Sequence, residues 1–422
     1  MVEGISRRGM LTSAAAGIAA VPLGSLAASA EQDGAAEFAV PPATGAITPF
    51  RLHVPEAVLR DLRRRLAATR FPERETVPDI SQGARLEQVR GLARHWLNRY
   101  DWRRTEARLN AFGQYRTKID GLGIHFLHVR SRHENATPLL LTHGWPGSVL
   151  EFADVIGPLT DPTAHGGRAE DAFHVIAPSL PGFGFSDKPT ETGWNLTRIA
   201  RAWTELMRRL GYGRYLAQGG DWGAGITQRM AEMGAPGLTA IHLNMAFISE
   251  PPLQGPPTPE EQAALDRFKW FAEEGSGYFE QQRTRPQTVG YALVDSPLGQ
   301  ASWIFEKFVD WTDSGGRPED EFGYDKILDD ITLYWLTGTG ASSARIYWEA
   351  MRDPTQPSEV TVPVGYTTFP KELVPMPKVW AERVFKDKLV YFNKVARGGH
   401  FAAFEQPAIF TSELRAFARA LR

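Results

Sequence analysis

The sequence contains no cysteine, and this absence removes several classes of chemistry. Disulfide bridges, thiolate nucleophiles, zinc ribbons and cysteine-bound iron–sulfur clusters are all excluded. Any covalent catalysis must therefore use oxygen or nitrogen. The chain also lacks an excess of charge of either sign, with 47 basic and 49 acidic residues. Because no global basic field exists, nucleic acids and anionic membranes are excluded as expected partners, and small neutral substrates are favoured.

The length and composition are those of a globular protein. The chain has 422 residues, of which 42% are apolar and 23% are charged. This is enough for one large domain that carries an insertion, or for two domains. A collagen and a disordered tail are excluded.

The first 30 residues have the pattern of an export signal. Arg7 and Arg8 precede an uncharged, alanine-rich stretch over residues 10–30, which ends in Ala-Ser-Ala. This pattern resembles a twin-arginine signal peptide with a small-residue cleavage site. A disordered start and a membrane anchor are the alternatives, but the stretch is only weakly hydrophobic. We expect export by the twin-arginine route to the periplasm or the extracellular space, with residues 31–46 as a linker.

The pattern then changes from helical to alternating. Residues 47–110 are expected to form a helical N-terminal region, because leucines recur at helical spacing within them. Residues 111–245 contain short apolar runs between amphipathic segments, which predicts a mostly parallel sheet with helices on both faces. The fold class is therefore α/β. The expected strands are residues 115–119, 124–129, 139–142, 173–178, 215–218 and 238–244.

After the sixth expected strand the alternation stops. Residues 246–356 are helical in pattern and rich in aromatic side chains, and the sheet pattern resumes over residues 357–422 with strands at 362–367 and 389–395. A helical block between strands of one sheet predicts a cap over the carboxyl ends of those strands. Open α/β sheets bind their ligands at that edge.

A tight turn after the fifth expected strand carries a candidate nucleophile. Residues 219–223 read Gly-Gly-Asp-Trp-Gly, which is the spacing of a nucleophile elbow with Asp221 where serine usually stands. Gly219 and Gly223 would allow the strand and the following helix to approach closely. An aspartate in a glycine-rich turn is also a common helix N-cap. The choice between the two interpretations depends on its partners.

A second turn supplies the expected oxyanion hole. Residues 143–147 read His-Gly-Trp-Pro-Gly and follow the strand at 139–142, where a hydrolase of this architecture places its second oxyanion-hole donor. A mere turn is the alternative, since proline and glycine are common in loops. In the catalytic interpretation, the backbone N–H groups of Trp145 and Trp222 converge on one oxygen.

Only two histidines follow Asp221 in the chain. His242 lies inside an apolar run and is expected to be packed. His400 follows a glycine pair after the last expected strand, so it is the candidate general base. Glu372 follows the strand at 362–367 and is the candidate acid that orients this histidine. A surface carboxylate is the alternative for Glu372.

Taken together, these motifs resemble the microsomal-type epoxide hydrolases. The resemblance extends from about Ile47 to the C-terminus and implies an α/β-hydrolase fold with a family-type N-terminal region. It also implies that two cap tyrosines, Tyr278 and Tyr347, hold the epoxide oxygen. Animal relatives carry a membrane anchor, so their membrane location is not carried over. The segments that carry the resemblance are residues 49–70, 143–146, 219–223, 369–372 and 398–401.

The resemblance implies hydrolysis of an apolar epoxide to a vicinal diol, with water as co-substrate. Asp221 would form an alkyl ester with the epoxide, and His400, oriented by Glu372, would then activate water. No metal or organic cofactor is expected. Detoxification and a biosynthetic step are both compatible with this chemistry, and the oligomeric state is left open.

Two other functions remain open at this point. A haloalkane dehalogenase uses the same aspartyl ester, and Trp222 could hold a halide beside the nucleophile. A catalytically silent protein of this fold could use its aromatic cap only to bind an apolar ligand. The charged elbow together with the Gly-Gly-His loop at residues 398–400 argues against silence. An ester hydrolase is disfavoured, since carboxylate attack on an ester would give an anhydride.

Overall fold

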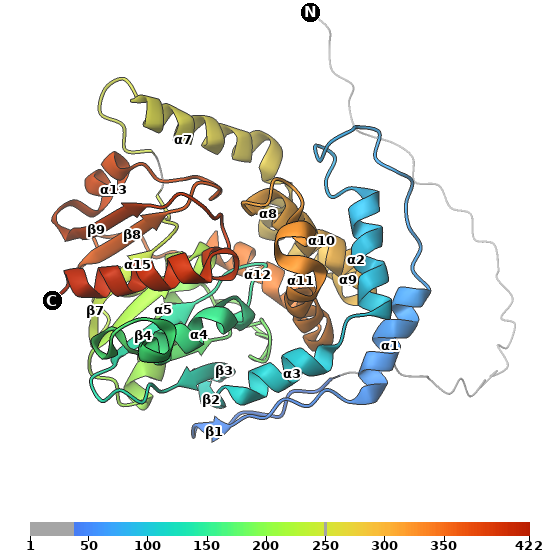
Figure 1. The fold of residues 1–422 in the computed structure, drawn as a ribbon, viewed down its shortest axis with the longest axis horizontal. Coiled ribbons are helices and arrows are strands. Elements are labelled where there is room, and N and C mark those ends of the chain that lie inside the picture. Colours follow the sequence, from blue (N-terminus) through green and yellow to red (C-terminus); the bar gives the residue numbers. More distant parts are fainter. Residues whose placement is uncertain (1–37, 249–250) are drawn as a thin grey trace, which may run out of the picture. The chain divides into compact units, whose positions relative to one another are not determined.

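The computed structural model describes residues 38–248 and 251–422, and the centre of this part is one sheet of nine strands (Figure 1). The strands stand in the order β1-β2-β3-β5-β4-β6-β7-β8-β9. Pairing is antiparallel from β1 to β5 and parallel between all later neighbours. The strands are β1 Thr48–Pro49, β2 Gln114–Ile119, β3 Leu122–Val129, β4 Thr137–Thr142, β5 Phe173–Pro178, β6 Tyr215–Gly219, β7 Leu238–Leu243, β8 Val364–Thr368 and β9 Leu389–Lys394.

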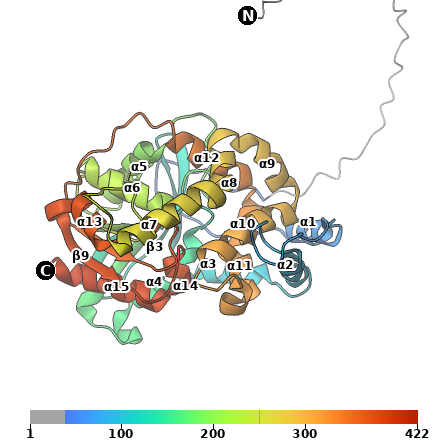
Figure 2. The ribbon, with the colours of Figure 1, turned by 90° about the horizontal axis from the view of Figure 1, so that it is seen from above.

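Helices cover both faces of this sheet. Helix α5 packs against α6 on one face, and α4 packs against α15 on the other (Figure 2). The central strand β6 is buried along its whole length, as expected for a strand enclosed between two helical layers. The predicted mostly parallel sheet with helices on both faces is therefore confirmed. The helices of these layers and of the C-terminal part are α4 Ala153–Thr160, α5 Leu196–Arg209, α6 Asp221–Glu232, α13 Lys378–Phe385, α14 Ala402–Glu405 and α15 Pro407–Ala420.

The cap follows β7, which is the sixth of the strands expected from the sequence. It consists of six α-helices within the described residues, and α10 is the most deeply buried of them along its apolar face. Helix α7 is mostly exposed and begins with a capping box in which Thr258 and Glu261 bond to each other's backbone N–H groups. The cap helices are α7 Pro259–Trp270, α8 Gly277–Thr284, α9 Pro286–Asp295, α10 Pro297–Trp311, α11 Pro318–Thr337 and α12 Gly340–Ala350.

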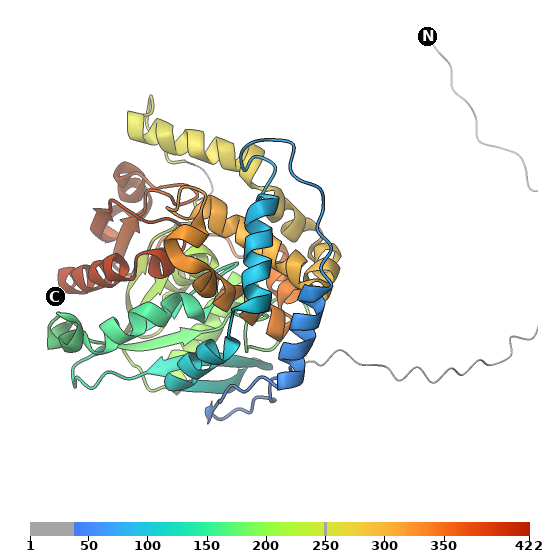
Figure 3. The ribbon, with the colours of Figure 1, turned by 45° about the vertical axis from the view of Figure 1, so that its right-hand side comes forward.

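The N-terminal helices pack against the cap from outside (Figure 3). They are α1 (Glu56–Ala67), α2 (Leu86–Asn98) and α3 (Trp102–Ala111). Leucines spaced along one side of α1 are buried, as their helical periodicity predicts. The hydroxyl of Tyr100 donates a hydrogen bond of 2.9 Å to Asp329 on α11. The N-terminal helices are thus fixed to the cap that is inserted within the sheet.

Some details differ from the expectation. The two-residue β1 was not expected, because so short a strand has no periodic pattern. The strand expected from residue 362 begins at Val364, since Pro363 has no N–H to donate to a neighbouring strand. The expected signal peptide over residues 1–30 lies outside the described residues. Among the helices that are described, none combines the length and the apolar character needed to cross a bilayer.

Candidate active site

The turn between β6 and α6 has the geometry of a nucleophile elbow. Asp221 adopts a φ of 48°, in the left-handed region that costs a non-glycine residue about 1 kcal/mol. A Cβ atom at Gly219 would collide with the carbonyl of Gly223, and one at Gly223 would collide with the carbonyl of Thr142. Gly220, not Asp221, occupies the N-cap position of α6. The Asp221 carboxylate is therefore available for other contacts.

One oxygen of Asp221 is held by the neighbouring turn. The backbone N–H of Trp145 donates a hydrogen bond of 2.8 Å to Oδ1 of Asp221. Gly144 is required here, because a Cβ atom at this position would collide with the same carboxylate. The N–H of Trp222 belongs to the first turn of α6, where backbone donors have no partner within the helix. Of the two sequence-predicted donors, Trp145 thus lies on the loop after β4 and bonds to Asp221, and Trp222 follows Asp221 in the first turn of α6.

The candidate base and acid lie on adjacent loops at the same edge of the sheet. Nδ1 of His400 is 2.6 Å from Oε1 of Glu372, and Nε2 of His400 is 3.4 Å from Oδ2 of Asp221. All three side chains are buried. The backbone N–H of Lys371 donates to the carbonyl of Gly398, which fixes the two loops to each other. The structure therefore brings Asp221, His400 and Glu372 together as one constellation.

The charge of His400 depends on these two carboxylates. Burial by itself disfavours the imidazolium, but the charges of Glu372 and Asp221 outweigh this and raise the pKa of His400 well above its usual value. The charge of Asp221 therefore favours the protonated form of His400. Any reaction that removes the charge of Asp221 will favour the neutral imidazole.

The two cap tyrosines lie above the elbow on α8 and α12. Tyr278 stacks on the indole of Trp145 at a centroid distance of 5.2 Å, and Tyr347 meets Trp222 edge to face at 4.7 Å. The two phenol rings are 5.8 Å apart. The Tyr347 hydroxyl is buried without a hydrogen-bond partner of normal geometry.

Both phenols are kept neutral. Burial, and then nearby charge including that of Asp221, raises the pKa of Tyr278 well above its usual value, and the same holds for Tyr347. A neutral phenol can donate a hydrogen bond. The structure therefore places two donors close to the carboxylate that the sequence predicts as nucleophile.

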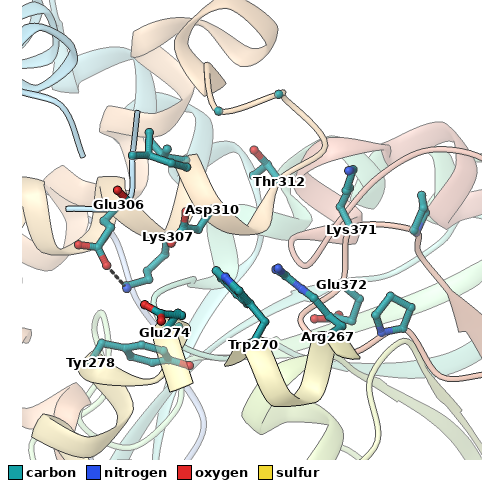
Figure 4. A pocket seen from close by; sticks show the side chains of 18 of the residues that line it. Arg267, Trp270, Glu274, Tyr278, Glu306, Lys307, Asp310, Thr312, Lys371 and Glu372 are labelled. Carbon is teal, nitrogen blue, oxygen red and sulfur yellow. Dashed lines mark hydrogen bonds and ion pairs between the residues drawn. The ribbon is translucent and has the colours of Figure 1, made fainter. Parts of the chain in front are cut away.

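A wide pocket reaches this site from the cap side (Figure 4). Its volume is about 1340 Å³, and its walls come from the N-terminal region, the cap and the loop after β8. Tyr278 and Glu372 line the pocket, with Trp270 and Arg267 of α7 beside them. This pocket is the access route that the structure offers to Tyr278 and Glu372.

Sequence reasoning missed two supporting residues on α10. The ammonium of Lys307 lies 4.4 Å from the centre of the Tyr278 ring, and Trp311 packs against the imidazole of His400. The carbonyl of Trp311 also accepts the His400 backbone N–H at 2.9 Å. The one available signal was a lysine within an apolar helix, because a lysine is rarely buried without a partner. Lys307 has such a partner in Glu306.

The first histidine after Asp221 in the chain has a structural position. His242 is buried within β7, and its Nε2 is 3.0 Å from the hydroxyl of Thr367. Burial lowers the pKa of His242 to about 3, so this imidazole stays neutral. It is a packed residue, as the sequence predicts.

Two family models match the chain. The model described as epoxide hydrolase N terminus matches residues 47–152, and the model described as alpha/beta hydrolase fold matches residues 137–294. A protein from Stigmatella aurantiaca (strain DW4/3-1), an epoxide hydrolase by provisional name, is 61% identical over 89% of this chain and 86% of its own. Epoxide hydrolase 1 of Sus scrofa is 36% identical over 88% of each chain.

Solved structures show the same similarity. The epoxide hydrolase of Aspergillus niger superposes with a TM-score of 0.80 at 33% identity, over 89% of this chain and 97% of the other. The juvenile hormone epoxide hydrolase of Bombyx mori superposes with a TM-score of 0.81 at 30% identity, over 89% and 95% of the two chains. The similarity thus includes the N-terminal region, the core and the cap.

Proposed function

The chain belongs to the epoxide hydrolase family and is a hydrolase enzyme of the α/β-hydrolase fold, and on that basis we propose that it opens an apolar epoxide through an ester on Asp221. The observation that carries this proposal is the position of the Asp221 carboxylate. Its Oδ1 accepts from Trp145, while its Oδ2 lies 3.4 Å from His400. A charged carboxylate needs no base before it attacks carbon.

In the first half of the reaction, Oδ2 of Asp221 bonds to one epoxide carbon and the bond between that carbon and the ring oxygen breaks. The ring oxygen takes a proton from Tyr278 or Tyr347, whose neutral phenols face the site. The aromatic rings of Trp145 and Trp222, which pack against the two tyrosines, support an apolar substrate. The product of this half is a hydroxyalkyl ester of Asp221 and a tyrosinate.

Ester formation also prepares the base. The ester carries no charge, so the effect that raises the pKa of His400 is reduced to that of Glu372 alone. His400 can then release its proton to restore the tyrosinate to a phenol. After this transfer the site holds a neutral imidazole next to the ester.

In the second half, His400 takes a proton from water, and the hydroxide adds to the carbonyl carbon of the ester. The N–H groups of Trp145 and Trp222 stabilise the resulting oxyanion, each by about 3 kcal/mol. When the bond to the alkyl oxygen breaks, the diol leaves with one proton and Asp221 regains its charge. His400 keeps the other proton of the water molecule and is again an imidazolium, as it was before the reaction.

Single turnover in heavy-oxygen water tests the ester. With enzyme in excess over styrene oxide, the label should enter the Asp221 carboxylate, because water attacks the enzyme's own carbonyl. Mass spectrometry of the peptide that contains Asp221 measures this. Label found only in the diol would show direct attack of water on the epoxide and would contradict the ester.

Removing both phenol hydroxyls should slow the first half of the reaction. The double variant Tyr278→Phe and Tyr347→Phe should form the ester at least about 100-fold more slowly, since no acid then protonates the ring oxygen. Rapid-quench mass spectrometry follows the ester directly. Tyr215→Phe is the matched control, because the Tyr215 hydroxyl is also buried without a partner but lies at the opposite end of β6. Equal rates in the two variants would exclude the tyrosines as acids.

We also propose that the chain is exported by the twin-arginine route. Arg7, Arg8 and the small residues that precede Glu31 support this, and they lie outside the described residues. The mass of the protein recovered from the periplasm or the medium should correspond to a chain that begins at Glu31. Recovery of the uncut chain from the cytoplasm alone would contradict export.

A further inference from the structure

Two small cavities lie behind the elbow and do not touch either cap tyrosine. Each has a volume of about 20 Å³, and roughly 10–15 Å³ suffices for one water molecule. The inner cavity borders both Asp221 and His400. The outer cavity borders Asp330 on α11. Neither cavity is part of the wide pocket below the cap.

The inner cavity is lined by polar atoms that need a partner. The hydroxyl of Thr142 and Oε1 of Gln218 are buried, and neither has a hydrogen-bond partner in the protein. The amide nitrogen of Gln218 is already used, since it donates to Asn244 at 2.8 Å. Buried polar atoms almost always have a partner, which is a water molecule where the protein provides none. The cavity therefore has the size and the lining of a water site beside His400.

The outer cavity lies between this region and partly exposed side chains. Oδ2 of Asp330 is buried without a partner, whereas its Oδ1 accepts from the Ser148 hydroxyl at 2.6 Å. The far wall is formed by Arg108 and Lys326, which are both partly exposed. Each of them pairs with Asp154. These side chains can separate and re-form their pairs at the surface, so water can exchange there.

Glu151 stands between the two cavities and lines both of them. It lies on the single-turn helix Val149–Phe152, directly after the loop that contains Trp145. Burial, and then the charge of Asp330, raises the pKa of Glu151 well above its usual value. A protonated carboxyl can donate one hydrogen bond and accept others. It can thus bond to a water molecule on either side.

We propose that the water that hydrolyses the ester reaches His400 from this rear side, through the two cavities, and that Glu151 is the positioning residue that holds it. This inference rests on the proposed function, since it concerns the second half of that reaction. While the ester is present, its alkyl group lies between Asp221 and the cap tyrosines and obstructs the front route. The water gives one proton to Nε2 of His400, and its oxygen bonds to the ester carbon. Glu151 neither gains nor loses a proton in this step.

Variants at Glu151 should separate the two halves of the reaction. With styrene oxide, Glu151→Leu should hydrolyse the ester about tenfold more slowly, the effect of one lost hydrogen bond to water, and should form the ester at the wild-type rate. Glu151→Gln should stay within about threefold of wild type, because its amide also donates and accepts. Rapid-quench mass spectrometry gives both rates, and the ester should accumulate only in Glu151→Leu.

Glu405→Gln is the matched control. Glu405 is also a buried glutamate near His400, but it borders neither cavity and bonds instead to the N–H groups of Phe401 and Asp313. Its variant should keep the wild-type ratio of the two rates. A wild-type ratio in Glu151→Leu, or a Glu151→Gln variant as slow as Glu151→Leu, would overturn the inference. A wild-type enzyme that forms no ester on Asp221 would instead overturn the proposed function, and this inference with it.

A crystal structure of the wild-type enzyme provides a second test that does not depend on the folding of any variant. Ordered water should occupy the inner cavity within hydrogen-bond distance of the Thr142 hydroxyl and of Oε1 of Gln218. A second water should lie between Glu151 and Asp330. A well-ordered inner cavity without water density would overturn the inference.

Discussion

Replacing Asp221 by alanine should lower diol formation by at least about 10⁴-fold, because the ester then has no oxygen on which to form. His400, Glu372 and both cap tyrosines would remain in place, so this variant measures what they achieve without the nucleophile. Chromatography of the diol over several hours gives the residual rate. Intact mass should show no adduct at any time.

The backbone of the elbow requires a second variant as control. Alanine at a φ of 48° destabilises the folded chain by about 1 kcal/mol, whereas asparagine tolerates this region about as well as aspartate does. Asp221→Asn should therefore keep the wild-type unfolding temperature and still be inactive, because an amide is a poor nucleophile. A folded Asp221→Asn protein with wild-type turnover would show that the carboxylate is not the attacking group.

Replacing His400 by glutamine should stop the enzyme after its first half-reaction. Asp221 needs no base to attack the epoxide, but water does need one to attack the ester. We expect ester formation to continue and diol release to fall about 10³-fold. The mass of the chain should rise by that of one substrate molecule and should stay raised.

His242→Gln is the matched control for this experiment. Both histidines are buried, but His242 contacts Thr367 within the sheet rather than Asp221. The His242→Gln chain should keep the wild-type ratio of the two half-reaction rates, so no ester should accumulate. If His400→Gln forms diol at the wild-type rate, another base must activate the water.

The sequence predicts the catalytic loops well because short-range chemistry determines them. The spacing of Gly219, Asp221 and Gly223 describes a turn that few other residues could form, and the structure has that turn. His400 could be selected because chain order and a glycine pair distinguish it from His242. Turn spacing and chain order depend on residues that are close in the sequence, so they can be recognised from the sequence alone.

The cap residues that contact the site could not be predicted in the same way. Tyr278 and Tyr347 come from helices that are separated by three others in the chain, and many cap aromatics have the same spacing. Only the family resemblance selected these two. Glu151 gave no signal either, because its position between two cavities depends on α11 and on the loop after β9, which are distant in sequence. Packing between remote segments decides these contacts.

The motifs alone also left the substrate class open. An aspartate at the elbow serves a haloalkane dehalogenase as well as an epoxide hydrolase, and Trp222 follows the nucleophile in either case. The relatives and solved structures reported above, which cover nearly nine tenths of the chain at 30% identity or more, are epoxide hydrolases. The reaction class is therefore established by similarity along the whole chain rather than by the elbow itself.

The attachment of the N-terminal helices to α11 limits how this enzyme can be shortened. Asp329 accepts hydrogen bonds from Tyr100 and Thr105, and Asp325 is 2.7 Å from His95. In a chain without the N-terminal helices, Asp325 and Asp329 would lose these hydrogen-bond partners. An apolar side of the cap would also become exposed to solvent. Residues 56–111 therefore serve as an outer wall of the reaction chamber, and only deletions that stop short of α1 should leave that chamber intact.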